Sequence, residues 1–172
     1  MRYNVSQLLK ENTGSTRQFE VDEVLPSPDP DWGEQLEVSG PVTLVRTPSG
    51  ILVAATLKTA IADVCARCVE PLIEPLDVEI EAEFFPTVDV WSGVAVAVPD
   101  DPEVFAIDKR HVLDLTDAFR QGVLVAREMR PLCRPDCRGL CPQCGTNLNN
   151  GQCSCDTAPG DPRWGALRRR SA

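Results

Sequence analysis

The chain has 172 residues, of which 26 are acidic, 17 are basic and eight are cysteines, and its formal net charge at pH 7 is −9. That length suffices for one modest domain with its own hydrophobic core, so the chain does not need metal merely to reach a stable size. No stretch approaches the roughly 18 continuous apolar residues of a membrane span, so we expect a cytoplasmic protein that makes no membrane contact. Cytoplasmic thiols stay reduced, which favours metal ligands or catalytic thiols over disulfides.

The first predicted elements are a short helix and a strand. Residues 4–11 predict a helix with Val5, Leu8 and Leu9 on one side. Residues 17–25 have the pattern of a strand, and a proline-rich connection follows them.

A longer β-hairpin comes next. Residues 35–46 and 51–64 flank a Thr-Pro-Ser-Gly turn, and the second of these strands leads directly into Cys65. Within the first strand we expect Gly40 and Pro41 to mark a bulge or an edge position.

The clearest strand pattern is residues 76–85, which alternate between apolar and acidic side chains. One side of this strand therefore faces a dry core, and the other side carries Asp77, Glu79, Glu81 and Glu83. The acidic side is either a hydrated outer surface or a docking surface for a basic partner. Residues 86–107 have loop character with some strand content and are not assigned.

Residues 113–131 predict the main helix, with Asp114 as its cap, Leu113 and Ala118 placed for a hydrophobic staple, and Pro131 as its stop. Apolar side chains recur at helical spacing at Leu115, Ala118, Phe119, Val123 and Ala126. We therefore predict an α+β fold, in which an antiparallel β-sheet is packed by one main helix and followed by a C-terminal cysteine-rich, zinc-ribbon-like segment.

The expected organisation has three parts. Residues 1–132 form the α+β core domain, residues 133–158 form a zinc-binding cysteine-rich segment packed on the core, and residues 159–172 form a basic tail. The charge distribution supports this division, because residues 1–108 carry a net charge of −14 and residues 109–172 carry +5. A basic segment on an acidic body fits contact with an anionic partner, although charged residues also simply hydrate a surface.

The cysteines form four close pairs, and these are Cys65 with Cys68, Cys133 with Cys137, Cys141 with Cys144, and Cys153 with Cys155. Thiolates at such spacings converge on one ion, so eight of them predict two closed, structural zinc sites with four sulfurs each. The last four cysteines can close on one ion locally around a Gly- and Asn-rich link, which leaves the first four for a site that joins distant segments. Exchanging the second and third pairs between the sites is the main alternative. Arg67, Arg134 and Arg138 can offset the excess thiolate charge.

Other chemistries for these cysteines are disulfides, a thioredoxin-type dithiol and iron–sulfur ligation. The single histidine, His111, is expected on the surface rather than at a metal. The sequence has no metalloprotease motif, phosphate-binding glycine loop or Ser/His/Asp arrangement, so we expect no enzyme activity and no small-molecule substrate.

Several motifs together resemble the YceD family, also called large ribosomal RNA subunit accumulation proteins. They are "CARCVEP" after a strand, "CRPDCRGLCPQCGTNLN" and "CSC" after the main helix, and the closing "DPRWGALRRR". The resemblance implies a non-enzymatic cytoplasmic ribosome biogenesis factor that promotes accumulation or processing of large-subunit ribosomal RNA, with the precursor RNA as its binding partner. Some family members have fewer cysteines, so the second metal site is not essential to the family's role.

Arginine contacts to phosphate and aromatic stacking on bases hold RNA, and the tail offers both. Its candidate RNA contacts are Arg163, Trp164, Arg168, Arg169 and Arg170, followed by Arg134 and Arg138 in the cysteine-rich segment. Alternatively, Trp164 packs on the domain and the arginines only hydrate the chain end. The runner-up function is a zinc-stabilised adaptor whose acidic sheet face binds a basic ribosomal protein or an assembly enzyme, and a redox enzyme is the third.

Overall fold

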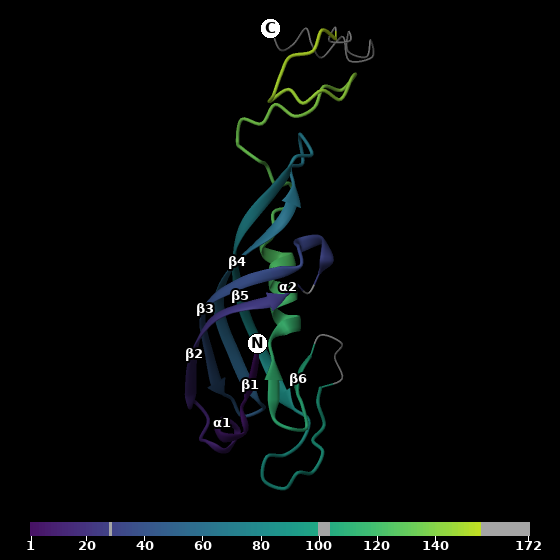
Figure 1. Ribbon diagram of the computed structural model, residues 1–172. Helices are drawn as coiled ribbons and strands as arrows, with labels where there is room; N and C mark the ends of the chain where they lie inside the picture. Colours follow the sequence, from purple (N-terminus) through teal and green to yellow (C-terminus); the bar gives the residue numbers. More distant parts are fainter. Residues whose placement is uncertain (28, 100–103, 156–172) are drawn as a thin grey trace, which may run out of the picture.

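A computed structural model describes residues 1–27, 29–99 and 104–155, and a five-stranded sheet with the order β2-β3-β4-β5-β6 forms its body (Figure 1). The strands are β2 (Thr16–Pro26), β3 (Gln35–Arg46), β4 (Ile51–Val64), β5 (Pro71–Pro86) and β6 (Phe105–Ile107). Antiparallel pairing joins the first four, and β6 adds a short parallel edge beside β5. The fold is α+β, as the sequence predicts.

Short elements complete the body. A two-stranded antiparallel sheet pairs β1 (Arg2–Asn4) with β7 (Val112–Asp114), and it was not expected from the sequence. The helices are α1 (Ser6–Lys10), the 3-10 turn η1 (Pro30–Trp32) and α2 (Thr116–Ala126). Among the described residues, none of these helices has the length and apolar character needed to cross a lipid bilayer.

The hairpin of β4 and β5 is the longest feature of the sheet. Its strands have 14 and 16 residues and stay in register from the pair of Ile51 and Phe84 to that of Val64 and Pro71. In Figure 1 the far end of this hairpin extends beyond the other strands, toward the cysteine-rich segment. The hairpin therefore carries its turn, which contains Cys65 and Cys68, to one end of the molecule.

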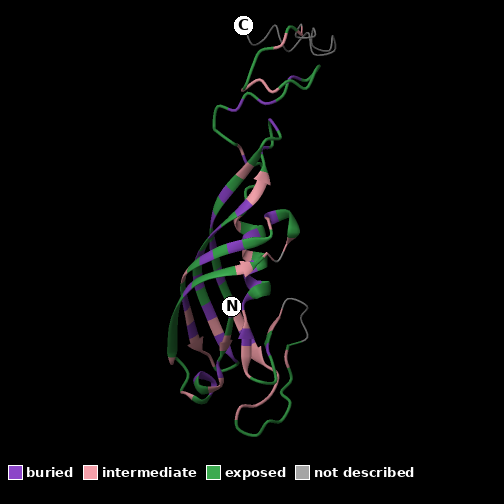
Figure 2. Ribbon diagram, in the orientation of Figure 1, coloured by how far each residue is buried: buried purple, intermediate pink, exposed green. Residues whose placement is uncertain are grey.

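The predicted alternation along β5 is confirmed, and bands of buried and exposed residues follow the strands in Figure 2. Its inward side chains Leu76, Val78, Ile80 and Phe84 are buried. Helix α2 packs on this dry face and buries Ala118, Phe119 and Val123. At the contact a Cβ on Gly122 would lie 2.6 Å from the Cγ1 atom of Val78, so the absent side chain lets helix and strand approach closely.

Helix α2 is shorter at both ends than the predicted span of 113–131. Its beginning is delayed because β7 pairs with β1, and Asp114 then accepts a 3.0 Å hydrogen bond from the backbone amide of Thr116. After Ala126 the chain turns extended, and the next two residues bind the long hairpin. Arg127 donates to Asp63 at 2.8 Å, and the amide of Glu128 donates to Glu74 at 2.8 Å.

The ion pair between Asp63 and Arg127 is shielded on its acidic side, because the Asp63 side chain is only 4% exposed. Burial alone would raise the pKa of Asp63, but hydrogen bonds from the Arg127 guanidinium and the Val64 amide hold it below its usual value. The carboxylate is therefore charged at neutral pH, and it ties the exit of α2 to the hairpin that carries the first cysteine pair.

The expectation that Gly40 and Pro41 mark a bulge or an edge is wrong. Strand β3 lies between β2 and β4, and its register with β4 is the same at Ser39 and at Val42, so no residue is inserted. Gly40 has a φ of +139°, and a Cβ there would lie 2.3 Å from the Thr56 carbonyl oxygen. The glycine therefore serves a close approach between two central strands.

Replacing Gly40 with alanine should lower the free energy of unfolding by about 2 kcal/mol or more, because backbone strain is combined with a collision against another strand. Gly14→Ala is the control, since Gly14 also has a positive φ, +90°, but nothing lies within 4 Å of a Cβ there. Urea denaturation of both variants measures the difference. Equal losses for the two variants would contradict a role for the contact with Thr56.

Candidate metal centres

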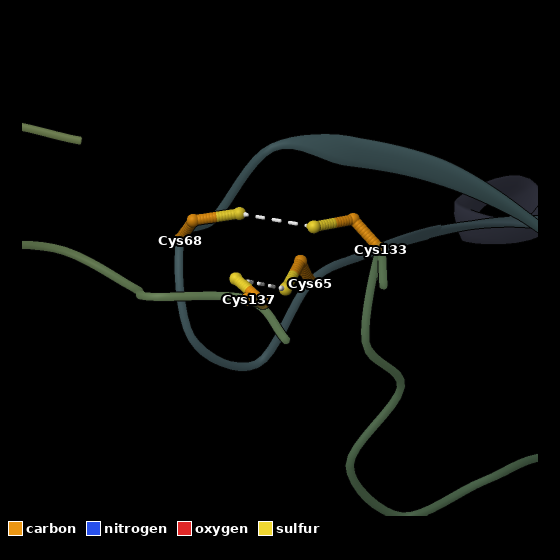
Figure 3. A group of neighbouring side chains, drawn as sticks. All are labelled: Cys65, Cys68, Cys133 and Cys137. Atoms are coloured by element: carbon orange, nitrogen blue, oxygen red, sulfur yellow. Dashed lines mark hydrogen bonds between the residues drawn. The ribbon is translucent and has the colours of Figure 1, made fainter. Parts of the chain in front are cut away.

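Four cysteines from two distant parts of the chain converge beyond the end of the long hairpin (Figure 3). Cys65 and Cys68 come from the turn between β4 and β5, whereas Cys133 and Cys137 follow α2. The Sγ atoms of Cys65 and Cys137 are 3.7 Å apart, and those of Cys68 and Cys133 are 3.6 Å apart. All four sulfurs lie within 4.8 Å of one another, and together they are called here the first cluster.

The backbone of the hairpin turn directs both of its sulfurs to one side. The Cys65 amide donates to the Glu70 carbonyl and the Val69 amide donates to the Cys65 carbonyl, both at 2.9 Å, with Val69 at a φ of 59°. The amide of Ala66 donates to the carbonyl of Pro131 at 2.8 Å. This last bond holds the turn directly against the chain that leaves α2.

The sulfur spacing fits a single tetrahedral ion. With metal–sulfur distances of about 2.3 Å, tetrahedral geometry places two sulfurs about 3.8 Å apart. A disulfide needs about 2.05 Å between two sulfurs and gives no reason for four to converge. A cluster of several irons with bridging sulfides is wider than one ion and needs its cysteine sulfurs further apart. The donor set therefore suits one thiophilic ion with a closed coordination shell.

The second cluster consists of Cys141, Cys144, Cys153 and Cys155, whose sulfurs also lie within 4.8 Å of one another. Its first turn is closed by the Gly145 amide, which donates to the Cys141 carbonyl at 2.9 Å, and by the Cys141 amide, which donates to the Thr146 carbonyl at 2.8 Å. Gly145 has a φ of +72°, which a glycine adopts without strain. The second cluster is therefore a local unit built on a turn typical of zinc ribbons.

Hydrogen bonds favour thiolates at particular positions of both clusters. A bond from the Cys133 backbone amide lowers the pKa of Cys65 to about 6, and the Thr146 hydroxyl lowers that of Cys144 to about 6. The neighbouring Cys144 side chain in turn raises the pKa of Cys155 to about 12. Thiols this close cannot all lose their protons unless a cation compensates the charge, and a divalent ion provides that compensation.

The cysteines are grouped as the reach argument predicts, and not in the exchanged arrangement. The arginines expected to compensate thiolate charge have mainly oxygen partners. Arg67 donates to the Cys137 carbonyl at 3.0 Å and Arg134 donates to the Asn149 side-chain oxygen at 2.9 Å. Arg138 is exposed. The predicted tail contacts, Arg163, Trp164, Arg168, Arg169 and Arg170, lie outside the described residues, as do residues 156–158 of the proposed cysteine-rich segment.

Two asparagines at the clusters were missed by the sequence reasoning, which treated residues 145–152 only as a link. Asn149 donates to the Cys137 sulfur at 3.3 Å, and Asn147 donates to the Glu70 carboxylate at 3.0 Å. A usable signal existed, because both asparagines belong to the "CGTNLN" string that carries the family resemblance.

The fold and the clusters define a small α+β protein with a cysteine-rich segment that could hold metal ions. The family model described as "Large ribosomal RNA subunit accumulation protein YceD" matches residues 53–169, which include all eight cysteines. The chain belongs to the YceD family.

The chain also has curated relatives in mycobacteria. Uncharacterized proteins of Mycobacterium tuberculosis and Mycobacterium bovis are 32% identical over 124 residues, which cover 69% of this chain and 54% of theirs. One from Mycobacterium leprae is 28% identical over 119 residues, covering 69% of this chain and 51% of its own. The chain thus spans about half the length of these relatives. No solved structure matches it.

Protein purified without chelator should contain two zinc ions per chain, and acidification should release them because protons compete for the thiolates. Cys65→Ser should destabilise the whole domain, because the first cluster joins distant segments. Cys153→Ser should affect mainly residues 141–155, because the second cluster is a local unit. Elemental analysis and thermal unfolding give the two readouts. One zinc per chain, or iron in its place, would contradict the assignment of all eight cysteines to zinc.

Proposed function

We propose that this protein is a non-enzymatic ribosome biogenesis factor that promotes accumulation or processing of large-subunit ribosomal RNA by binding the precursor RNA. The observation that carries the proposal is the YceD family match, which extends over residues 53–169 and thus over both clusters and most of the basic tail. The family description names accumulation of the large ribosomal RNA subunit. Direct contact with the RNA is proposed in addition to that role.

In this proposal the two zinc ions are structural. Four sulfurs complete the coordination shell of each ion, so no position is left for a water or a substrate. The ions would fix residues 133–158 as a compact unit on the α+β core of residues 1–132, and would present the tail of residues 159–172 beyond it. No candidate catalytic group is required for such a role.

Charge supports RNA contact at the end of the molecule that carries the clusters. Arg67, Arg130, Arg134 and Arg138 are all exposed there. The Arg134 guanidinium donates to the Asn149 oxygen at 2.9 Å and pairs with Asp136 at 3.5 Å, so its side chain is already partly ordered but would have to leave Asp136 to bind a phosphate. The tail adds further arginines and Trp164 to the same end of the sequence. The acidic body, by contrast, would repel an RNA wrapped around the whole molecule.

Changing Arg168, Arg169 and Arg170 together to alanine should weaken RNA binding about equally for all sequences. The slope of the logarithm of the binding constant against the logarithm of the salt concentration should become shallower by up to about three units, because fewer counterions are released when three phosphate contacts are lost. Trp164→Ala should cost about 1–3 kcal/mol on single-stranded RNA if its ring stacks on a base. Titration of deproteinised precursor RNA at several salt concentrations measures both effects.

Zinc content serves as the control and should be unchanged in these variants. An unaltered affinity and salt slope in the triple variant would move the contact to Arg134 and Arg138. Absence of any RNA binding by the parent protein at low salt would refute the proposal.

A second candidate function, an adaptor for a basic protein, is favoured by the register of the sheet. Asp22, Ser39, Lys58 and Asp77 form one cross-strand row on the face turned away from the buried side chains. The same face carries acidic side chains at Glu20, Asp22, Glu37, Asp77, Glu79, Glu81 and Glu83, with Lys58 as a basic residue among them. Small side chains such as Ala54 and Thr56 lie between the acidic rows, which leaves a shallow floor for a Lys- or Arg-rich segment.

Reversing two charges on this face, with Glu79→Lys and Glu81→Lys, should weaken binding of a Lys- and Arg-rich ribosomal protein by about tenfold or more, because like charges then face each other. The matched control is Glu23→Lys with Glu34→Lys, which changes the net charge equally away from this face. Binding is measured by calorimetry at physiological salt. Equal effects of the two pairs would reduce the interaction to net charge and refute a specific docking face.

A further inference from the structure

Residues 145–152, which link the two cysteine pairs of the second cluster, also contact the first cluster. Asn147, Leu148 and Asn149 lie between Cys144 and Cys153 in the sequence, yet their contacts lead back to the first cluster. The side chain of Asn149 donates an N–H···S hydrogen bond of 3.3 Å to Cys137. Asn149 therefore supports a cysteine of the first cluster, although it lies in the link between Cys144 and Cys153 of the second cluster.

The orientation of the Asn149 amide follows from its other partners. Its side-chain oxygen accepts hydrogen bonds from the Arg138 backbone amide at 2.8 Å and from the Arg134 guanidinium at 2.9 Å. Both of these groups can only donate, so the oxygen must face them and the NH₂ group must face the sulfur. The amide is thus held on both sides, and the bond to Cys137 is not an accident of a freely rotating side chain.

Further bonds tie the same link to the turn between β4 and β5. Asn147 donates to Glu70, and its own side-chain oxygen accepts from the Asn149 amide at 3.0 Å. The amide of Leu140 donates to the Arg67 carbonyl at 3.2 Å, and the amide of Leu148 donates to the Gly139 carbonyl at 2.9 Å. A Cβ on Gly139 would come within 3.0 Å of that Arg67 carbonyl oxygen, so the two segments are closely apposed.

We propose that Asn149 couples the two metal centres, so that an ion in the second cluster strengthens the binding of the ion in the first. This inference rests on the proposed zinc sites. An ion in the second cluster fixes both ends of the link, at Cys144 and Cys153, and thereby positions Asn149. Its N–H group then withdraws charge from the Cys137 thiolate, which eases the accumulation of four negative charges around one divalent ion.

Without an ion in the second cluster, the link loses its anchors at Cys144 and Cys153, and only hydrogen bonds keep Asn149 against Cys137. The expected size of the effect follows from other metal sites, where loss of an outer-shell hydrogen bond weakens metal binding by about 10- to 100-fold. Coupling between binding sites is reciprocal, so the first ion strengthens the second by the same factor.

The test is Asn149→Asp in the full chain, which retains all eight ligands and an oxygen acceptor for Arg134 and Arg138 but removes the N–H donor. Zinc affinity of the first cluster, measured by competition with a chromophoric chelator, should fall by about tenfold or more. Asn150→Asp is the matched control, because it adds the same charge one residue away on an exposed side chain. It should leave the affinity unchanged.

A double-mutant cycle separates coupling from a merely local effect. Cys153→Ser with Cys155→Ser should leave one zinc ion per chain, bound more weakly, and adding Asn149→Asp should weaken it no further. Additive losses of zinc affinity in the combined variant, or an unchanged affinity in Asn149→Asp, would overturn the coupling. If the parent protein still binds two zinc ions, the zinc proposal stands in either case. A parent protein that binds no metal would overturn both. If the serine variant does not fold, the zinc affinity of the second cluster in Asn149→Asp decides instead, because reciprocal coupling requires it to fall by the same factor as that of the first cluster and an unchanged value overturns the inference.

Discussion

Convergence of four thiolates at the first cluster is the constraint on which the rest of this structure depends. Cys68 and Cys133 are 65 positions apart in the sequence, yet their sulfurs approach to 3.6 Å. Closing so long a loop costs entropy, and bringing thiolates together costs electrostatic energy as well. A bound ion would offset both costs, because its binding free energy becomes folding free energy when the ligands converge only in the folded chain. Two hydrogen bonds, from Arg127 to Asp63 and from the Glu128 amide to Glu74, join the same hairpin and the chain after α2 at a second place.

The sheet and the segment beyond the long hairpin expose different sets of charged side chains. The sheet exposes rows of carboxylates, whereas the segment beyond the long hairpin exposes arginines at Arg67, Arg134 and Arg138 together with the acidic Glu70 and Asp136. Asn149 links this surface to the first cluster, since the same side chain holds Arg134 and contacts the Cys137 sulfur.

Much of the fold follows from local patterns that a single sequence displays. The alternation at Val78, Ile80 and Phe84 predicts the dry face of β5, and the helical spacing of Phe119 and Val123 predicts the helix that covers it. The limits of α2 were not predictable in this way, because its start depends on pairing with Arg2–Asn4 and its end on partners in the hairpin. Gly40 was misinterpreted because its reason is a close approach of Thr56, which is a tertiary contact. Cysteine spacing predicted the two clusters, whereas the roles of Asn147 and Asn149 required knowledge of which segments meet.

The central claim is that each cluster of four sulfurs holds one zinc ion and that the first ion joins the hairpin to the chain after α2. Zinc K-edge X-ray absorption on the purified protein tests it most directly, because it reports the ligands of the ion itself. We expect about four sulfur neighbours per zinc at about 2.3 Å, with no nitrogen or oxygen ligand at about 2.0–2.1 Å. A mixed shell with oxygen or nitrogen, or a metal other than zinc at these sites, would contradict it.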